Sequence, residues 1–153
     1  MIRGVHHVAI STPDLDRALG FYRDLLGFQE VQRVTWNAGA DQIDRVMNLQ
    51  GTAARQVMLK AGNLCLELFE FHSPTPRPAD PERPVCDHGH THICLDVTDI
   101  QEVYDRLVEA GVRFHCTPQD FGDVCATYGR DPDGNVFELQ ELLAPDDPSR
   151  VID

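Results

Sequence analysis

Cations are scarce in this chain of 153 residues, which carries a single lysine, Lys60, and a formal net charge of −12 at pH 7. Nucleic-acid binding depends on clustered lysine and arginine side chains that neutralise phosphates and release their counterions. The composition therefore excludes nucleic acid as a partner.

Cysteine shows neither pairing nor metal-binding spacing: the five residues are odd in number, and no C-x-x-C motif occurs. This pattern favours free thiols in a reducing compartment over a disulfide framework or a structural zinc site. The sequence also lacks an apolar run of about 18 residues and a signal-peptide layout at its N-terminus. We therefore expect a cytoplasmic protein that does not enter a membrane.

An internal repeat occupies both halves of the chain. The segment VHHVAISTPDLDRALGFYRDLLGF has a divergent second copy, HTHICLDVTDIQEVYDRLVEAGV, in which His7 matches His92 and Asp14 matches Asp99. Each copy has the pattern of a short apolar strand, an Asp that can cap a helix, an amphipathic helix and a Gly stop. The chain thus contains two similar halves, each opening with a strand histidine.

Apolar patterning and turn signals extend the repeat to two βαβββ modules. The first module is predicted to have a helix at 14–26 and strands at 5–11, 28–34, 55–60 and 63–71. The second is predicted to have a helix at 99–110 and strands at 90–97, 112–116, 124–129 and 136–142. Together they predict an α+β fold with a curved mixed sheet.

Proline marks the boundary between the modules. Five prolines fall between Ser73 and Pro84, too many for a helix or a central strand. We assign residues 1–72 to the first module, 73–87 to a connector, 88–143 to the second module and 144–153 to a loose tail.

Two glutamates interrupt otherwise apolar strands, where an isolated carboxylate is costly to desolvate. Glu67 lies in LCLELF and Glu138 in VFEL, in the last strand of each module, whereas the repeated histidines lie in the first strand. Two imidazoles and two carboxylates could bind a divalent metal, whose charge would offset carboxylate burial. Taken singly, such residues are more often solvent-facing or bonded to a carbonyl, but their matching positions in both repeats favour the metal interpretation.

These motifs, with HICLDV and DPDGNVFELQE, resemble the vicinal oxygen chelate superfamily, which includes glyoxalase I, methylmalonyl-CoA epimerase, extradiol dioxygenases and fosfomycin or bleomycin resistance proteins. The resemblance covers about residues 4 to 142. It implies that the modules surround a metal cavity holding one divalent ion, which could be zinc, nickel, cobalt, manganese or iron. Carried over to this sequence, the metal ligands are His7, Glu67, His92 and Glu138.

The resemblance leaves the reaction open. Four protein ligands leave an octahedral ion two positions, which suits a bidentate substrate in proton-transfer chemistry. Glyoxalase I has an arginine at the position of Ser11, whereas methylmalonyl-CoA epimerases have a small residue there and share the pattern HVAI-x-x-PDL, so the epimerases match better. Coenzyme A would, however, require a basic cluster, and we find none. The resemblance puts Glu138 forward as the base and Glu67 as its counterpart.

We therefore predict a metal-dependent isomerase, epimerase or glyoxalase-like lyase that abstracts a proton beside a metal-bound carbonyl of a small oxo or acyl substrate. Two alternatives stay open. An extradiol-type dioxygenase would use two histidines and one carboxylate, so the additional Glu67 argues against it. Sequestering proteins of the resistance type often lack the metal set, which this chain retains. We expect a homodimer.

Strand alternation places further residues on the faces of the proposed ligands. The pocket residues predicted on strands are Ser11, Cys65, Phe69, His90, Cys94 and Gln140. The connection at 35–51 has no counterpart in the second module, and we expect it to form a lid with Trp36 or Met47 against the substrate. Alternatively, this connection covers a sheet edge or forms a dimer contact.

Overall fold

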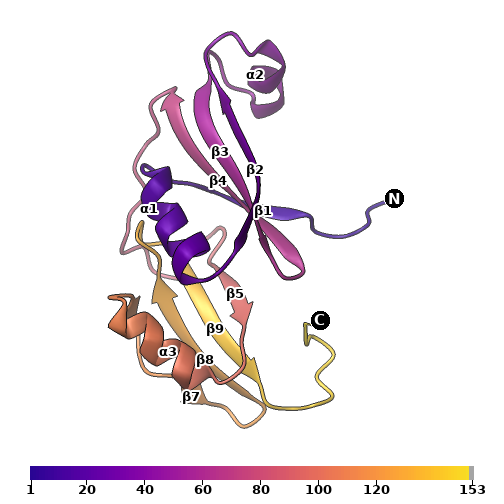
Figure 1. The fold of residues 1–153 in the computed structure, drawn as a ribbon, viewed down its shortest axis with the longest axis vertical. Coiled ribbons are helices and arrows are strands. Elements are labelled where there is room, and N and C mark those ends of the chain that lie inside the picture. The colour runs from indigo at the N-terminus through magenta and orange to yellow at the C-terminus, as the bar shows by residue number, and fades with distance from the viewer. Residues whose placement is uncertain (152–153) are drawn as a thin grey trace. The chain divides into compact units, whose positions relative to one another are not determined.

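A computed structural model of the chain describes residues 1–151. The chain divides into two compact units, Met1–Ala79 and Asp80–Asp153. Each unit has its own mixed sheet with a helix packed against it (Figure 1), which confirms the predicted α+β class. The division between the units falls inside the proline-rich segment 73–87.

The first unit has a four-stranded sheet in the order β1-β4-β3-β2. Strand β1 is parallel to β4, and the other neighbours are antiparallel. Its elements are β1 (His7–Ser11), α1 (Leu15–Leu19), the π-helical continuation η1 (Gly20–Leu25), β2 (Gln29–Trp36), α2 (Asp41–Met47), β3 (Ala53–Ala61) and β4 (Leu64–Ser73). The predicted first helix is therefore part α-helical and part π-helical.

The second unit repeats this topology, with the path β5-β9-β8-β6 and β7 paired to β8. Its first strand is again parallel to its last. Its elements are β5 (His92–Asp96), α3 (Ile100–Glu109), β6 (Arg113–Phe114), β7 (Gln119–Asp120), β8 (Val124–Arg130) and β9 (Val136–Leu142). Strand β6 is shorter than predicted, and β7 was not predicted. Among the described residues, no helix has the length and apolarity needed to cross a membrane.

One face of each sheet is apolar and buries the helix that follows the first strand. In the first unit, Leu66 and Leu68 of β4 are buried, as are Leu15 and Leu19 of α1. In the second unit, the buried residues include Leu107 of α3 and Phe137 and Leu139 of β9. Because side chains alternate along a strand, residues 67 and 138 point to the opposite, open face of their sheets.

A glutamate from the last strand receives the N-terminus of the helix in both units. Glu70 Oε2 accepts the backbone N–H of Leu15 at 2.8 Å. The two carboxylate oxygens of Glu141 accept the N–H groups of Asp99 and Ile100 at 2.9 and 3.1 Å. These carboxylates satisfy amides that have no partner within the helix and lie at the positive end of its dipole.

The two aspartates predicted to cap these helices behave differently. Asp14 caps α1 as predicted, because its Oδ1 accepts the N–H of Arg17 at 3.0 Å. Asp99 has a left-handed backbone, with φ of 53°, and its side chain makes no capping bond. The prediction that Asp99 caps the second helix is therefore wrong, and the long side chain of Glu141 takes that role from β9.

Candidate metal centre

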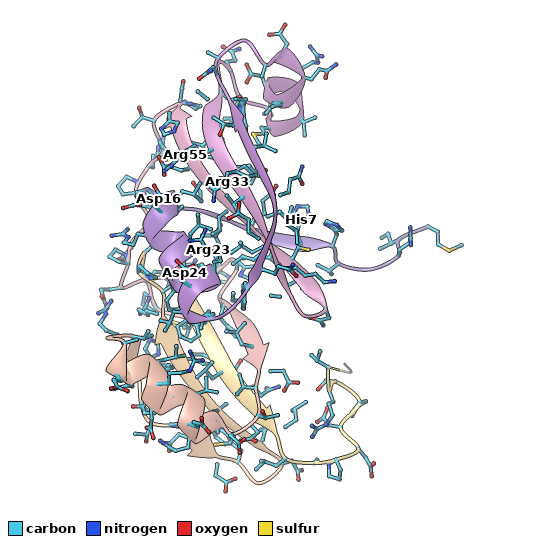
Figure 2. The ribbon with its side chains drawn as sticks, viewed as in Figure 1. His7, Asp16, Arg23, Asp24, Arg33 and Arg55 are labelled. Atoms are coloured by element: carbon cyan, nitrogen blue, oxygen red, sulfur yellow. The ribbon has the colours of Figure 1, made fainter. Side chains whose placement is uncertain are left out.

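The first histidine–glutamate pair lies across the parallel strands β1 and β4. The register places His7 opposite Cys65 and Ala9 opposite Glu67, so the two side chains share one face. His7 Nε2 is 3.4 Å from Glu67 Oε2, and the Glu67 side chain is 16% exposed. Figure 2 shows His7 on β1. Its other ring nitrogen, Nδ1, lies 2.9 Å from Nδ1 of His6.

The second pair has the same register across β5 and β9, with His92 opposite Val136 and Cys94 opposite Glu138. His92 Nε2 is 3.1 Å from Glu138 Oε2, and the Glu138 side chain is 15% exposed. The Nδ1 atom of His92 lies 2.9 Å from the hydroxyl of Thr91. Both units thus present a mostly buried carboxylate beside an Nε2 atom.

The donor sets of both pairs fit a divalent ion. Two ligands at right angles, with bonds of about 2.1 Å, are separated by about 3 Å, close to the spacing within each pair. A hydrogen bond at Nδ1 leaves Nε2 available for a metal, which is the usual arrangement of ligand histidines. Among residues 1–151, no three His, Cys, Asp or Glu side chains form a group suited to an ion. The described contacts are one His–Glu pair in each unit.

Sequence reasoning missed the two residues that engage Nδ1 of these histidines. Strict alternation along a strand would place His6 on the opposite face from His7, yet its ring meets His7 because it precedes the regular strand. Thr91 holds the same position before His92. A polar side chain directly before each repeated histidine was the available signal.

The environment of the Glu67 carboxylate on β4 differs from that of the Glu138 carboxylate on β9. Gln56 of β3 donates its amide Nε2–H to Glu67 Oε1 at 3.0 Å. Glu138 instead accepts a hydrogen bond from the Cys94 thiol. A thiol is a weaker donor than an amide, so the two carboxylates are held with different strength.

Cys94 and Tyr128 both lie beside Glu138 and remain protonated near neutral pH. Cys94 is exposed as a residue, but desolvation of its thiol by the surrounding groups, followed by the charge of Glu138, raises the pKa of Cys94 to about 12. Burial, Glu138 and Cys94 raise the pKa of the Tyr128 hydroxyl. The Tyr128 ring also lies 4.9 Å from the ring of His92, measured between centroids. These groups are thus neutral donors rather than nucleophiles.

Three aromatic rings gather on the Glu67 face of the first sheet. Phe69 and Phe71 of β4 stack with their centroids 5.4 Å apart. The ring of Trp36 meets them edge-on at 6.3 and 6.4 Å. Trp36 is the last residue of β2 rather than part of the following loop. Its Nε1–H donates to Thr52 Oγ1 at 3.0 Å.

The connection that carries α2 is tied to the start of β3. Asp44 of α2 accepts the backbone N–H groups of Gly51 and Thr52 at 2.7 and 3.0 Å, and also the hydroxyl of Thr52. The hydrogen bonds from the Thr52 side chain and from both backbone groups lower the pKa of Asp44. The same threonine binds Trp36, so the end of β2 and helix α2 share one network.

The other predicted pocket residues are placed as follows. Ser11 pairs with Phe69, and Cys65 pairs with His7, on the Glu67 face. Cys94 and Gln140 lie on the Glu138 face, on β5 and β9. His90 precedes β5, and its backbone carbonyl accepts a bond from Arg83 at 3.2 Å. Met47 closes α2, outside the sheet.

The duplicated unit, with its parallel first and last strands and its open face, defines a class of protein. The model of the glyoxalase/bleomycin resistance protein/dioxygenase superfamily matches residues 4–139, and the chain belongs to this superfamily. The family predicted from the motifs is confirmed.

Among its relatives, the chain is 34% identical over 122 residues to a 2-epi-5-epi-valiolone epimerase from Actinomyces sp. That match covers 78% of this chain and 66% of the relative, slightly less than two thirds of its length. The chain is 32% identical over 120 residues to an ethylmalonyl-CoA/methylmalonyl-CoA epimerase from Cereibacter sphaeroides, covering 74% and 75%. A glyoxalase family protein from Bacillus cereus shares the fold, with a TM-score of 0.85, 23% identity and coverage of 94% and 97%.

Proposed function

We propose that the protein is a metal-dependent epimerase or isomerase that moves a proton beside the carbonyl group of a small oxo or acyl compound. The observation that carries this proposal is the His–Glu pair, present with the same register in both units. The two relatives named as epimerases support the choice of reaction within the superfamily.

The proposed metal ligands are Nε2 of His7 and His92 and one carboxylate oxygen each of Glu67 and Glu138. Imidazole and carboxylate together suit several first-row divalent ions, so zinc, nickel, cobalt, manganese and iron are all candidates. When bound, such an ion would polarise a substrate carbonyl as a Lewis acid. Its charge would also offset the cost of burying two carboxylates.

Proton transfer requires a group that takes the proton from carbon and a group that returns it. Glu138 is the proposed base, and Glu67 is its counterpart. Cys94 and Tyr128 stay neutral beside Glu138, so they can donate hydrogen bonds without competing for the proton. The rings of Trp36 and Phe69 supply an apolar wall for the rest of the substrate.

The four-ligand set is favoured over the dioxygenase alternative by the equivalence of the two pairs. A ring-cleaving dioxygenase would need two histidines and a single carboxylate, with three positions left for catechol and oxygen. Here each histidine faces its own glutamate, at 3.4 and 3.1 Å, and both glutamates are mostly buried.

Metal content and metal affinity test this function. Elemental analysis of the purified protein should find one divalent ion per chain, and titration calorimetry should show that the His7→Ala, His92→Ala double variant binds it far more weakly. His88→Ala, which changes an exposed histidine outside the strands, should bind as the parent does. Full occupancy in the double variant would contradict the ligand assignment.

Turnover is then tested with the metal-loaded parent. A panel of small 2-oxo acids and acyl thioesters is incubated in heavy water, and exchange of the hydrogen beside the carbonyl is followed by NMR. An epimerase should exchange this hydrogen for deuterium and, where the carbon that carries it is a stereocentre, invert the configuration at that carbon. Metal binding without exchange on any member of the panel would favour the sequestering type of protein.

A further inference from the structure

Glu67 is held by a buried amide from the neighbouring strand. Gln56 of β3 is 5% exposed, and its Nε2–H donates to Glu67 Oε1 at 3.0 Å. The other carboxylate oxygen, Oε2, faces Nε2 of His7 at 3.4 Å. Each carboxylate oxygen of Glu67 therefore has its own partner, and the carboxylate cannot rotate without breaking the hydrogen bond from the Gln56 amide.

The environment of Gln56 shows that its amide depends on this contact. Its neighbours on the same face of β3, Ala54 and Met58, are apolar and buried. A buried amide without a partner costs roughly 1–3 kcal/mol, so a glutamine here is tolerated only when a nearby acceptor satisfies it. Glu67 is that acceptor, and a role in packing alone would be filled equally well by leucine or methionine.

The second unit has no glutamine at the corresponding position. Gln56 pairs with Phe69, two residues after Glu67. In the second unit, the residue two positions after Glu138 is Gln140, and it pairs with Ala126, whose methyl group cannot donate a hydrogen bond. The two His–Glu pairs therefore differ at this position, as they also do at the residues paired directly with the glutamates, which are Ala9 and Met58 beside Glu67 and Cys94 and Tyr128 beside Glu138.

We propose that Gln56 is a positioning residue that fixes Glu67 as a ligand of the divalent ion, and that Ala126 in its place leaves Glu138 free to act on the substrate. The inference rests on the proposed function, since it assigns distinct roles to the two glutamates of that site. An amide bonded to one carboxylate oxygen orients the other toward the ion, as outer partners of metal ligands commonly do.

The test is the affinity of the purified full chain for Mn²⁺ and Zn²⁺, measured by titration calorimetry. Gln56→Met keeps the volume and removes the amide, and it should weaken binding about tenfold to a hundredfold. Gln32→Met is the matched control, because Gln32 lies on β2, where it pairs with Met58 of β3, and its side chain is exposed. It should bind as the parent does. If Gln56→Met does not fold, Gln56→Asn, whose amide is one methylene too short, should show the same loss.

A double-mutant cycle separates positioning from packing. In a Glu67→Ala background, Gln56→Met should cause no further loss of affinity, because the carboxylate that it positions is gone. A similar loss in both backgrounds would assign Gln56 to packing and overturn the inference. So would parent-like affinity of a folded Gln56→Met protein. A parent that binds neither ion would instead overturn the proposed function, and this inference with it.

Discussion

The two halves of the chain agree in their skeleton and differ on their open faces. Both have a parallel pair of first and last strands, a His–Glu pair in the same register and a strand glutamate that receives the helix. In the part of the chain that the structure describes, helix α2, the cluster of Trp36, Phe69 and Phe71 and the Gln56 amide bonded to Glu67 belong to the first half. The common parts are those that fold the unit and could bind an ion, whereas the divergent parts surround the carboxylates.

This difference suggests a division of labour. The first half offers a fixed carboxylate and an apolar wall, which suit holding an ion and a substrate. The second half offers a carboxylate flanked by a neutral thiol and a neutral phenol, which suits proton transfer. Variants made at matching positions in the two halves can test this division directly.

The largest expected effect comes from the two glutamates of the proposed site. Glu138→Gln should lower kcat by about 10²- to 10⁴-fold, because an amide cannot accept a proton, while it retains most of the affinity for the ion. Glu67→Gln should instead act mainly on ion affinity, measured by calorimetry beside steady-state kinetics. Equal losses of kcat and affinity in the two variants would remove the distinction between the halves.

A second comparison concerns the glutamates that receive the helices. Glu70 accepts the Leu15 N–H and also binds Arg55 Nη2 at 2.6 Å. Arg55 further contacts Asp16 at 3.2 Å (Figure 2), and its Nε is buried without a hydrogen-bond partner. Glu141 accepts the backbone N–H groups of Asp99 and Ile100 at the start of α3.

Glu70→Gln should therefore destabilise the protein by about 2–3 kcal/mol, since it weakens bonds to a charged group. Glu141→Gln should cost about 1 kcal/mol, the usual value of a helix cap. Urea unfolding of both variants at neutral pH gives the comparison. A larger loss for Glu141→Gln would show that the ion pair with Arg55 contributes little.

The same carboxylate gives a pH dependence of known sign. Burial opposes ionisation of Glu70, but the Leu15 N–H and the Arg55 guanidinium outweigh it and lower its pKa. A group whose pKa is lowered by folding stabilises the protein above its unfolded pKa, and this stabilisation is lost as pH falls through the folded pKa. The stability gap between the parent and Glu70→Gln should thus narrow as pH falls below 4.5, the ordinary pKa of a glutamate, and a constant gap would contradict this assignment.

The comparison also shows what the sequence can predict. Alternation located the strands of both halves except β7, and helical periodicity located the helix that follows each first strand. The matching positions of His7 and His92 identified the repeat. Asp14 and Asp99 have the same sequence pattern but different backbones, so only one of them caps its helix. Local propensity cannot see the carboxylate of Glu141, which arrives from a distant strand.

The contact between Gln56 and Glu67 was not predicted, for the same reason. Its relation to Glu67 depends on the register of β3 with β4, which the sequence pattern alone does not fix. The π-helical form of η1 and the two-residue strand β7 were also not predicted, because each is too short to show a distinct period. Contacts between strands therefore limit prediction of the site more than the identity of its acidic residues does.

The smallest expected effect concerns Trp36, which has no counterpart in the second half. Its ring meets Phe69 edge-on, and an aromatic contact of this kind is worth about 0.5–1.5 kcal/mol. If the ring forms the wall against the substrate, Trp36→Ala should raise KM about threefold to tenfold with little change in kcat. Trp36→Phe keeps an aromatic ring but loses the bond to Thr52, so it should have a smaller effect.

Fluorescence gives an independent measure, because Trp36 is the single tryptophan of the chain. A substrate that reaches the aromatic cluster should shift its emission in the metal-loaded protein, and the shift should saturate at the concentration that saturates turnover. The Trp36→Phe variant controls for emission from tyrosine. If a confirmed substrate leaves the emission of Trp36 unchanged, and Trp36→Ala has the KM of the parent, the segment 35–51 does not act as a lid. It would then cover a sheet edge or belong to a dimer contact, and the apolar wall would have to be sought elsewhere on the open faces.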